Sequence, residues 1–150
     1  MIGNNWIEKY VKAGSNNTDI DDLITLSKDE SYRIRMRVAE NRSTPPAVLE
    51  LLSKDKHADV RLAAGTNPAT PIDSVYLLAL DEDPTVRHGL AEDHNTPIGV
   101  LKILAKDDNA YVSHRALKTI SRLDANLGSV HGIEAHRLWN WPAHNVQRFA

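Results

Sequence analysis

The chain has 150 residues, with 18 basic and 20 acidic side chains, a formal net charge of −2 and no cysteine. That length suits one domain with a continuous core, while the balanced charge disfavours a protein that coats nucleic acid, since such proteins carry a basic excess. The lack of cysteine excludes disulfides, iron–sulfur clusters and thiol chemistry. No apolar run is long enough for a membrane span, and Met1–Trp6 lacks the charged start and apolar run of a signal peptide. We therefore expect a cytoplasmic protein without membrane contact.

A period of 26 residues runs through most of the chain. Threonine and aspartate recur at this spacing, at Thr18, Thr44, Thr70 and Thr96 and at Asp29, Asp55, Asp81 and Asp107. Four self-similar units cover roughly residues 9 to 123, and such a period is typical of a repeat array. Units of this kind bury their apolar faces only by stacking. We therefore predict a helical repeat array over 1–123 and a non-repeating C-terminal capping segment over 124–150, together one domain.

Each unit is predicted to begin with a short helix, as in residues 59–64. Residues suited to the N-cap precede it in most units, and Pro84 follows Asp83 directly, which is typical of a first helical position. Apolar side chains four residues apart mark one buried face. These columns are Ile34, Val60, Val86 and Val112, and Val38, Ala64, Leu90 and Ala116.

A second short helix is predicted to start at each recurring threonine, with the hydroxyl at the N-cap and, in three units, proline after it. Steps of three residues define the predicted buried columns. They are Ile20, Pro46, Ile72 and Ile98; Leu23, Leu49, Val75 and Leu101; and Leu26, Leu52, Leu78 and Leu104. Two such short helices per unit predict an all-α fold, a solenoid of about four stacked two-helix repeats.

The unit resembles the variant leucine-rich repeat, a relative of the HEAT repeats. The resemblance is carried by Val60-Arg61, Asn67, Thr70-Pro71, Val75, Leu78 and Asp81 and by their counterparts 26 positions away. It covers about three-quarters of the chain and implies a right-handed helical solenoid used as an interaction scaffold. Some members carry an iron–sulfur segment, which a chain without cysteine cannot hold. A plain HEAT-like two-helix repeat is the alternative.

Arg35, Arg61 and Arg87 share one column, which Ser113 interrupts. Helices of neighbouring units pack about 8–10 Å apart, so these guanidinium groups should form a ladder. One interpretation pairs each arginine with an aspartate that recurs nearby. The other is an anion-binding stripe for phosphate or an acidic partner.

Histidines give only weak indications of a metal site. His88 and His114 share a column, and His131 and His136 match neither order of the zinc-protease motif. The chain also lacks a glycine-rich phosphate loop and the common nucleophile motifs. We therefore expect no metal, no cofactor and no catalytic residues.

The exposed positions of the second helices differ between units, as expected for a surface adapted to one partner. The candidate partner-binding residues are Glu50, Tyr76, Lys102 and Asp73, with Trp139 and Trp141 in the tail. The leading hypothesis is a non-enzymatic scaffold, an adaptor or inhibitor-like module that binds a protein partner through this ridge. The alternative is a HEAT-like nucleic-acid-binding protein or DNA glycosylase of the alkylpurine type.

Overall fold

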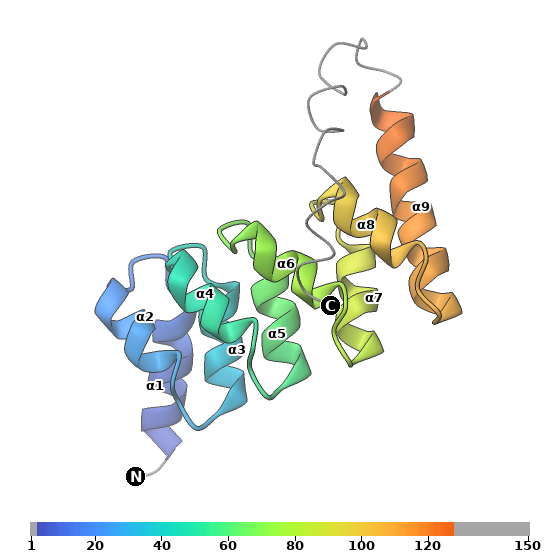
Figure 1. Cartoon of the computed structure of the whole chain (residues 1–150). Coiled ribbons are helices and arrows are strands. Elements are labelled where there is room, and N and C mark those ends of the chain that lie inside the picture. Colours follow the sequence, from blue (N-terminus) through green and yellow to red (C-terminus); the bar gives the residue numbers. More distant parts are fainter. Residues whose placement is uncertain (1–2, 128–150) are drawn as a thin grey trace.

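A computed structural model describes residues 3–127 of the chain, and every regular element in that part is a helix (Figure 1). The all-α prediction is therefore confirmed for this part. The helices are α1 (Gly3–Gly14), α2 (Ile20–Leu26), α3 (Tyr32–Glu40), α4 (Pro46–Leu52), α5 (Ala58–Gly65), α6 (Ile72–Leu78), α7 (Pro84–Glu92), α8 (Ile98–Leu104) and α9 (Ala110–Leu127).

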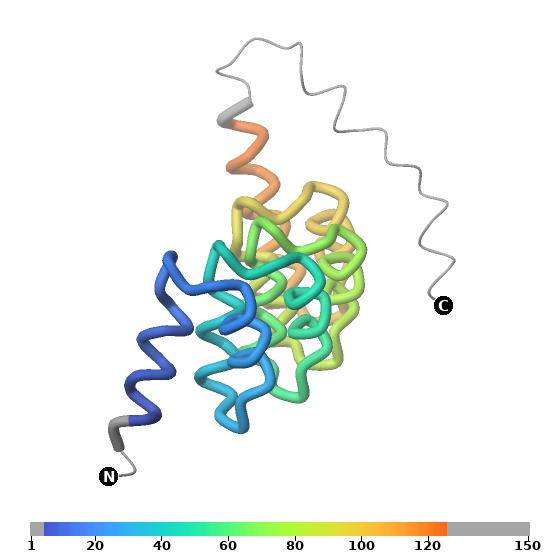
Figure 2. Tube along the Cα trace, turned by 90° about the vertical axis from the view of Figure 1, so that its left-hand side faces the viewer, coloured from blue at the N-terminus to red at the C-terminus, as the bar shows by residue number. Residues whose placement is uncertain are grey.

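The helices lie in two layers that follow the chain order (Figures 1 and 2). In one layer α1 packs on α3, α3 on α5, α5 on α7 and α7 on α9. The seven-residue helices α2, α4, α6 and α8 form the other layer. Of these, α2, α4 and α8 each pack on the long helices before and after them, and α6 packs on α5. The helices α3, α5, α7 and α9 begin at residues 32, 58, 84 and 110, so their starts recur at the interval found in the sequence.

The core lies between the two layers and largely matches the predicted columns. All eight residues of the two first-helix columns are buried, as are the second-helix columns that begin at Leu23 and Leu26. The column that begins at Ile20 is wrong, because Ile20 and Ile72 are exposed by 57% and 39%. Val48, Ser74 and Val100 are buried in its place. Val48 lies four residues before Leu52, whereas the predicted Pro46 lies six residues before it. Residues four apart share one face of an α-helix and residues six apart do not, so Val48 lies on the buried face.

The recurring threonines do not cap the second helices as predicted. The N-cap residues of α4, α6 and α8 are Pro45, Pro71 and Pro97, so each helix begins one position later than expected. The threonine hydroxyl points backward instead: Thr44 Oγ1 donates to the carbonyl of Val38 at 2.6 Å, and Thr96 Oγ1 to that of Leu90 at 2.8 Å. It thereby satisfies a carbonyl in the last turn of the preceding helix, which has no partner within the helix.

Helix α9 is longer than the other helices, and it runs through the predicted boundary at residues 123 and 124 to Leu127. The rest of the predicted capping segment, with Trp139 and Trp141, lies outside the described residues. Among the helices that the structure describes, none combines the length and apolar character that a membrane crossing needs.

Candidate binding surface

The arginine column forms a ladder of two-point ion pairs along the layer of longer helices. Arg35 donates from Nε and Nη2 to Asp55 at 2.7 and 2.9 Å. Arg61 binds Asp81 at 2.7 and 2.8 Å in the same way, and Arg87 binds Asp107 at 2.6 and 3.2 Å. Each pair joins a helix to the turn that precedes the next long helix. Such parallel bonds fix geometry as well as charge.

The same groups also organise the turns between units. Nη1 of Arg61 donates to the carbonyl of Asp55 at 2.9 Å, and the carboxylate of Asp55 accepts from the backbone N–H of His57 at 2.8 Å. Burial alone would raise the pKa of Asp55, but the bonds from Arg35 and His57 hold that pKa below its ordinary value. The pairing interpretation of the sequence is therefore confirmed. The anion-binding interpretation stays a prediction, and these neutralised guanidinium groups weigh against it.

A second ladder, formed by the side-chain amides of Asn41 and Asn67, also joins successive units. The side-chain amide of Asn41 donates to the carbonyls of Ala13 and Ser15 at 2.8 and 2.9 Å. The amide of Asn67 donates to the carbonyls of Ala39 and Asn41 at 2.7 and 3.0 Å. The sequence offered one signal, which is asparagine at the same register of two successive units. In the structure both side chains are buried, and buried amides need hydrogen-bond partners.

The candidate partner-binding residues lie in the layer of short helices. Glu50 on α4, Asp73 on α6 and Lys102 on α8 are exposed, and Glu50 pairs with Lys54 at 3.0 Å. Tyr76 differs, because it is half-buried against the core and burial raises the pKa of its hydroxyl. A Cβ atom at Gly99 would collide with the Tyr76 hydroxyl, so glycine allows this ring to lie over α8. Tyr76 therefore supports the packing of α6 on α8 as well as shaping the surface.

Aliphatic side chains also stand on this surface, and the sequence interpretation missed them. Leu51 on α4 is exposed by 64%, Leu77 on α6 by 40%, and Leu80 in the following turn by 60%. We call the outward-facing residues of α4, α6 and α8 the short-helix ridge; they are Glu50, Leu51, Tyr76, Leu77, Lys102 and Ile103. The ridge combines exposed apolar and charged groups, as binding surfaces do.

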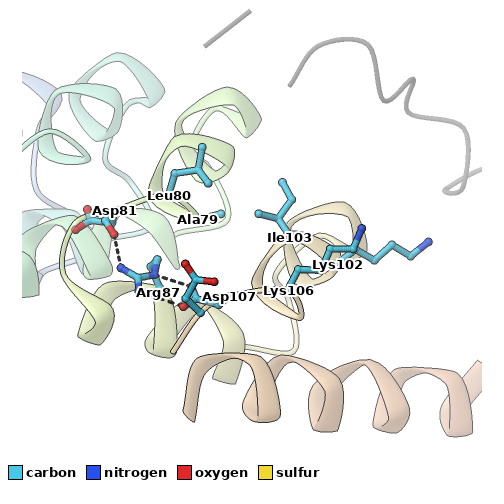
Figure 3. A pocket seen from close by; sticks show the side chains of 9 residues that line it. Ala79, Leu80, Asp81, Arg87, Lys102, Ile103, Lys106 and Asp107 are labelled. Carbon is cyan, nitrogen blue, oxygen red and sulfur yellow. Dashed lines mark hydrogen bonds and ion pairs between the residues drawn. The ribbon is translucent and has the colours of Figure 1, made fainter. Parts of the chain in front are cut away.

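An open groove of about 530 Å³ lies at the end of the ridge, between the C-terminal ends of α6 and α8. Figure 3 shows Leu80 on the α6 side and Ile103 on the α8 side, with the ion pair of Arg87 and Asp107 at the base. Lys102 and Lys106 line the groove from the α8 side.

The histidines are not brought into a metal site by the described part of the chain. Within that part, no group of three or more histidine, aspartate or glutamate side chains is arranged to hold a metal ion. His88 is half-buried on α7 and His114 is exposed on α9. His131 and His136 lie outside the described residues.

Comparison of the chain with protein-family models, with curated proteins and with solved structures gives no match. The resemblance to variant leucine-rich repeats and HEAT repeats therefore remains a prediction from the sequence.

Proposed function

We propose that the chain is a right-handed α-solenoid of about four two-helix repeats that acts as a non-enzymatic protein-binding scaffold. The partner is a protein, and the binding surface is the short-helix ridge. In this proposal Glu50, Asp73 and Lys102 supply charged contacts beside the apolar groups of the ridge.

The observation that carries the proposal is the exposure of Leu51 and Leu77 at the same register of successive helices. Each leucine is next to a buried core position that recurs in every unit. In α2 the position equivalent to Leu51 is the polar Thr25, so the fold does not require an apolar side chain there. Contiguous exposed apolar groups with charged neighbours are typical of protein-interaction sites. Tyr76, at the centre of the ridge, adds an aromatic contact of the kind that often contributes most to affinity.

The nucleic-acid alternative has less support. It needs a channel of available basic groups, whereas Arg35, Arg61 and Arg87 are each bound to an aspartate. Binding of a DNA duplex that weakens steeply with salt would favour this alternative over the scaffold.

The proposal is tested by capturing partners from native cell extract with immobilised full chain and comparing variants by quantitative mass spectrometry. The ridge variant carries Leu51→Glu and Leu77→Glu. The matched control is Leu117→Glu, which changes a leucine of 55% exposure on α9. We expect proteins captured by the wild type and the control to be lost from the ridge variant. An identical set of captured proteins on all three baits would contradict the proposal.

A further inference from the structure

Leu117 on α9 stands at a register that every earlier long helix buries. The residues at this register in α1, α3, α5 and α7 are Ala13, Ala39, Gly65 and Ala91, and all of them are buried. Gly65 lies under the next long helix, because an added Cβ atom there would lie 3.1 Å from Cδ2 of Leu90 on α7. Helix α9 is the last described helix, and there Leu117 is exposed by 55%. We call Leu117 and the half-buried Ile120, three residues further along the same side of α9, the end face.

The end face is not shaped for another unit of the same kind. Alanine or glycine at this register lets the next long helix approach closely, whereas a leucine holds it away. Ser113 stands where α3, α5 and α7 carry the arginine of the ion-pair ladder, and Arg122 stands at the register of the recurring threonines. Helix α9 accordingly runs on to Leu127 instead of ending in the turn that follows the other long helices. The end face therefore suits an occupant of a different shape.

A second copy stacked head to tail would place its α1 on the end face, and the charges of α1 disfavour this. The registers of Val86 and Leu90, buried on α7, hold Glu8 and Lys12 on α1, both exposed. Lys12 would then oppose Leu117 as Leu90 opposes Gly65, and its ion pair with Asp22 at 2.7 Å would lose contact with water. Taking charged groups out of water costs free energy that one ion pair often does not return.

The chain itself supplies an occupant in residues 128–150, which follow α9 directly and lie outside the described part. We call them the C-terminal segment; its large apolar residues are Leu138, Trp139, Trp141 and Phe149. Aromatic side chains of this size gain strongly from burial.

The C-terminal segment is long enough to reach the end face. Eleven residues lead from Leu127 to Leu138, and an extended chain of that length spans about 36 Å. Leu117 lies ten residues before Leu127 on the same helix, which is about 15 Å back along the axis. Leu138 and the two tryptophans can therefore lie over Leu117 while α9 stays intact.

From these observations we propose that the C-terminal segment folds back on α9 and packs Leu138, Trp139 and Trp141 over the end face. It buries the register that the following long helix buries in the earlier units. This inference goes beyond the scaffold function and does not depend on the short-helix ridge. It assigns Trp139 and Trp141 to the closure of the array rather than to a partner.

The contact is tested by photo-crosslinking in the full chain. The photoreactive residue p-benzoylphenylalanine replaces Leu117 or, as a matched control, Leu51, which is exposed by 64% on α4. Mass spectrometry of a mixture of isotopically labelled and unlabelled chains identifies the cross-linked residues and shows whether they belong to one molecule. We expect cross-links within one molecule from position 117 to residues 138–141, and none to these residues from position 51.

Tryptophan fluorescence gives a second measurement. In a Trp6→Phe background, Trp139 and Trp141 are the remaining tryptophans. Adding Leu117→Glu should shift their emission to the red and increase quenching by acrylamide, because the segment leaves the end face. Adding Leu51→Glu should change neither. Far-UV circular dichroism checks that both variants keep their helices.

Several results would overturn the proposal. Cross-links from position 117 that occur only between molecules would assign the end face to a second copy. An absence of cross-links to the C-terminal segment, or equal emission and quenching with and without Leu117→Glu, would show that the segment does not cover α9.

The extract experiment keeps this inference separate from the scaffold proposal. Proteins captured by the wild type but not by Leu117→Glu would assign the end face to a partner protein and overturn the inference. An unchanged set on the ridge variant would instead overturn the scaffold function, and the cross-links from position 117 would still test the end face.

Discussion

Two sets of polar contacts connect α3 with α5, whereas only one set connects α5 with α7. We call the contact between two successive long helices a joint, and each set of polar contacts across it a tie. Both joints have the arginine–aspartate pair, Arg35 with Asp55 and Arg61 with Asp81. At the first joint the amide of Asn67 adds two bonds to carbonyls of the preceding unit. At the second joint the same register holds Asp93, whose carboxylate has no N–H to donate and accepts from the backbone N–H of Asn95 instead.

The division of the hydrophobic core coincides with this joint. One buried cluster ends with Val60 and Ala64 on α5, and the other contains Val75 on α6 and Val86 on α7. Leu62 on α5 bridges them by packing over Gly89, where a Cβ atom would lie 2.5 Å from its Cδ1. The joint on the far side of α7 has a second tie again, since Thr119 Oγ1 donates to the carbonyl of Ala91 at 2.6 Å. The comparison indicates that the α5–α7 joint is the weakest in the described array.

The largest effect is expected from Arg61→Ala, which removes the remaining polar tie of that joint. Loss of one partner leaves the buried carboxylate of Asp81 uncompensated and should cost about 3–5 kcal/mol. Because the joint has no second tie, urea unfolding followed by circular dichroism should also broaden, as the two halves separate. Arg35→Ala is the matched control, with a similar loss but a single sharp transition. Equally sharp transitions in both variants would show that the joints are equivalent.

Asn67→Asp makes the first joint resemble the second. The new carboxylate can keep the bond from the backbone N–H of Ala69, but the carbonyls of Ala39 and Asn41 lose the amide as a donor. The carbonyl of Asn41 keeps its bond from the backbone N–H of Thr44 at 3.1 Å. Loss of the two amide bonds at these carbonyls should lower the free energy of unfolding by about 1–3 kcal/mol. The midpoint of urea unfolding measures this loss, and an unchanged midpoint would mean that the amide ladder does not stabilise the stack.

Asp93→Asn is the reverse exchange and should stabilise the protein. An amide at this register can donate to the carbonyls that correspond to those bound by Asn67, those of Gly65 and Asn67. The expected gain is about 0.5–1.5 kcal/mol for each bond formed. Thermal unfolding by calorimetry measures it, with Asp108→Asn as a control at an exposed aspartate. A loss of stability, or an equal gain in the control, would contradict the role of the missing amide.

The smallest expected effect is the pH dependence of the stability that the ion pair between Arg87 and Asp107 contributes. This pair lies between α7 and α9, on the far side of the α5–α7 joint. The bond from Arg87 lowers the pKa of the Asp107 carboxyl, although burial opposes this. Because the pKa is lower in the folded chain, the contribution to stability is complete above the ordinary carboxyl pKa and is lost as the pH falls through the lowered value. The difference in unfolding free energy between wild type and Asp107→Asn should therefore shrink between neutral pH and pH of about 3. A difference that stays constant with pH would contradict this assignment.

The sequence by itself determined the all-helical class, the interval between helices and most of the core. Helical spacing and turn residues are local properties, so the columns of Val60 and Leu78 could be predicted from one chain. The pairing of Arg61 with an aspartate was one of two interpretations that the spacing allowed, and only the contact across 20 residues in the structure decided between them.

Tertiary structure alone decided which way several side chains face. The threonine at Thr44 turns toward the preceding helix, Asn67 reaches buried carbonyls of the previous unit, and Ile20 lies in solvent beside the buried Leu23. These outcomes depend on how neighbouring helices approach each other, which no local pattern specifies. The groove at Leu80 was missed for the same reason, because its walls come from two helices and become one surface only after the units stack.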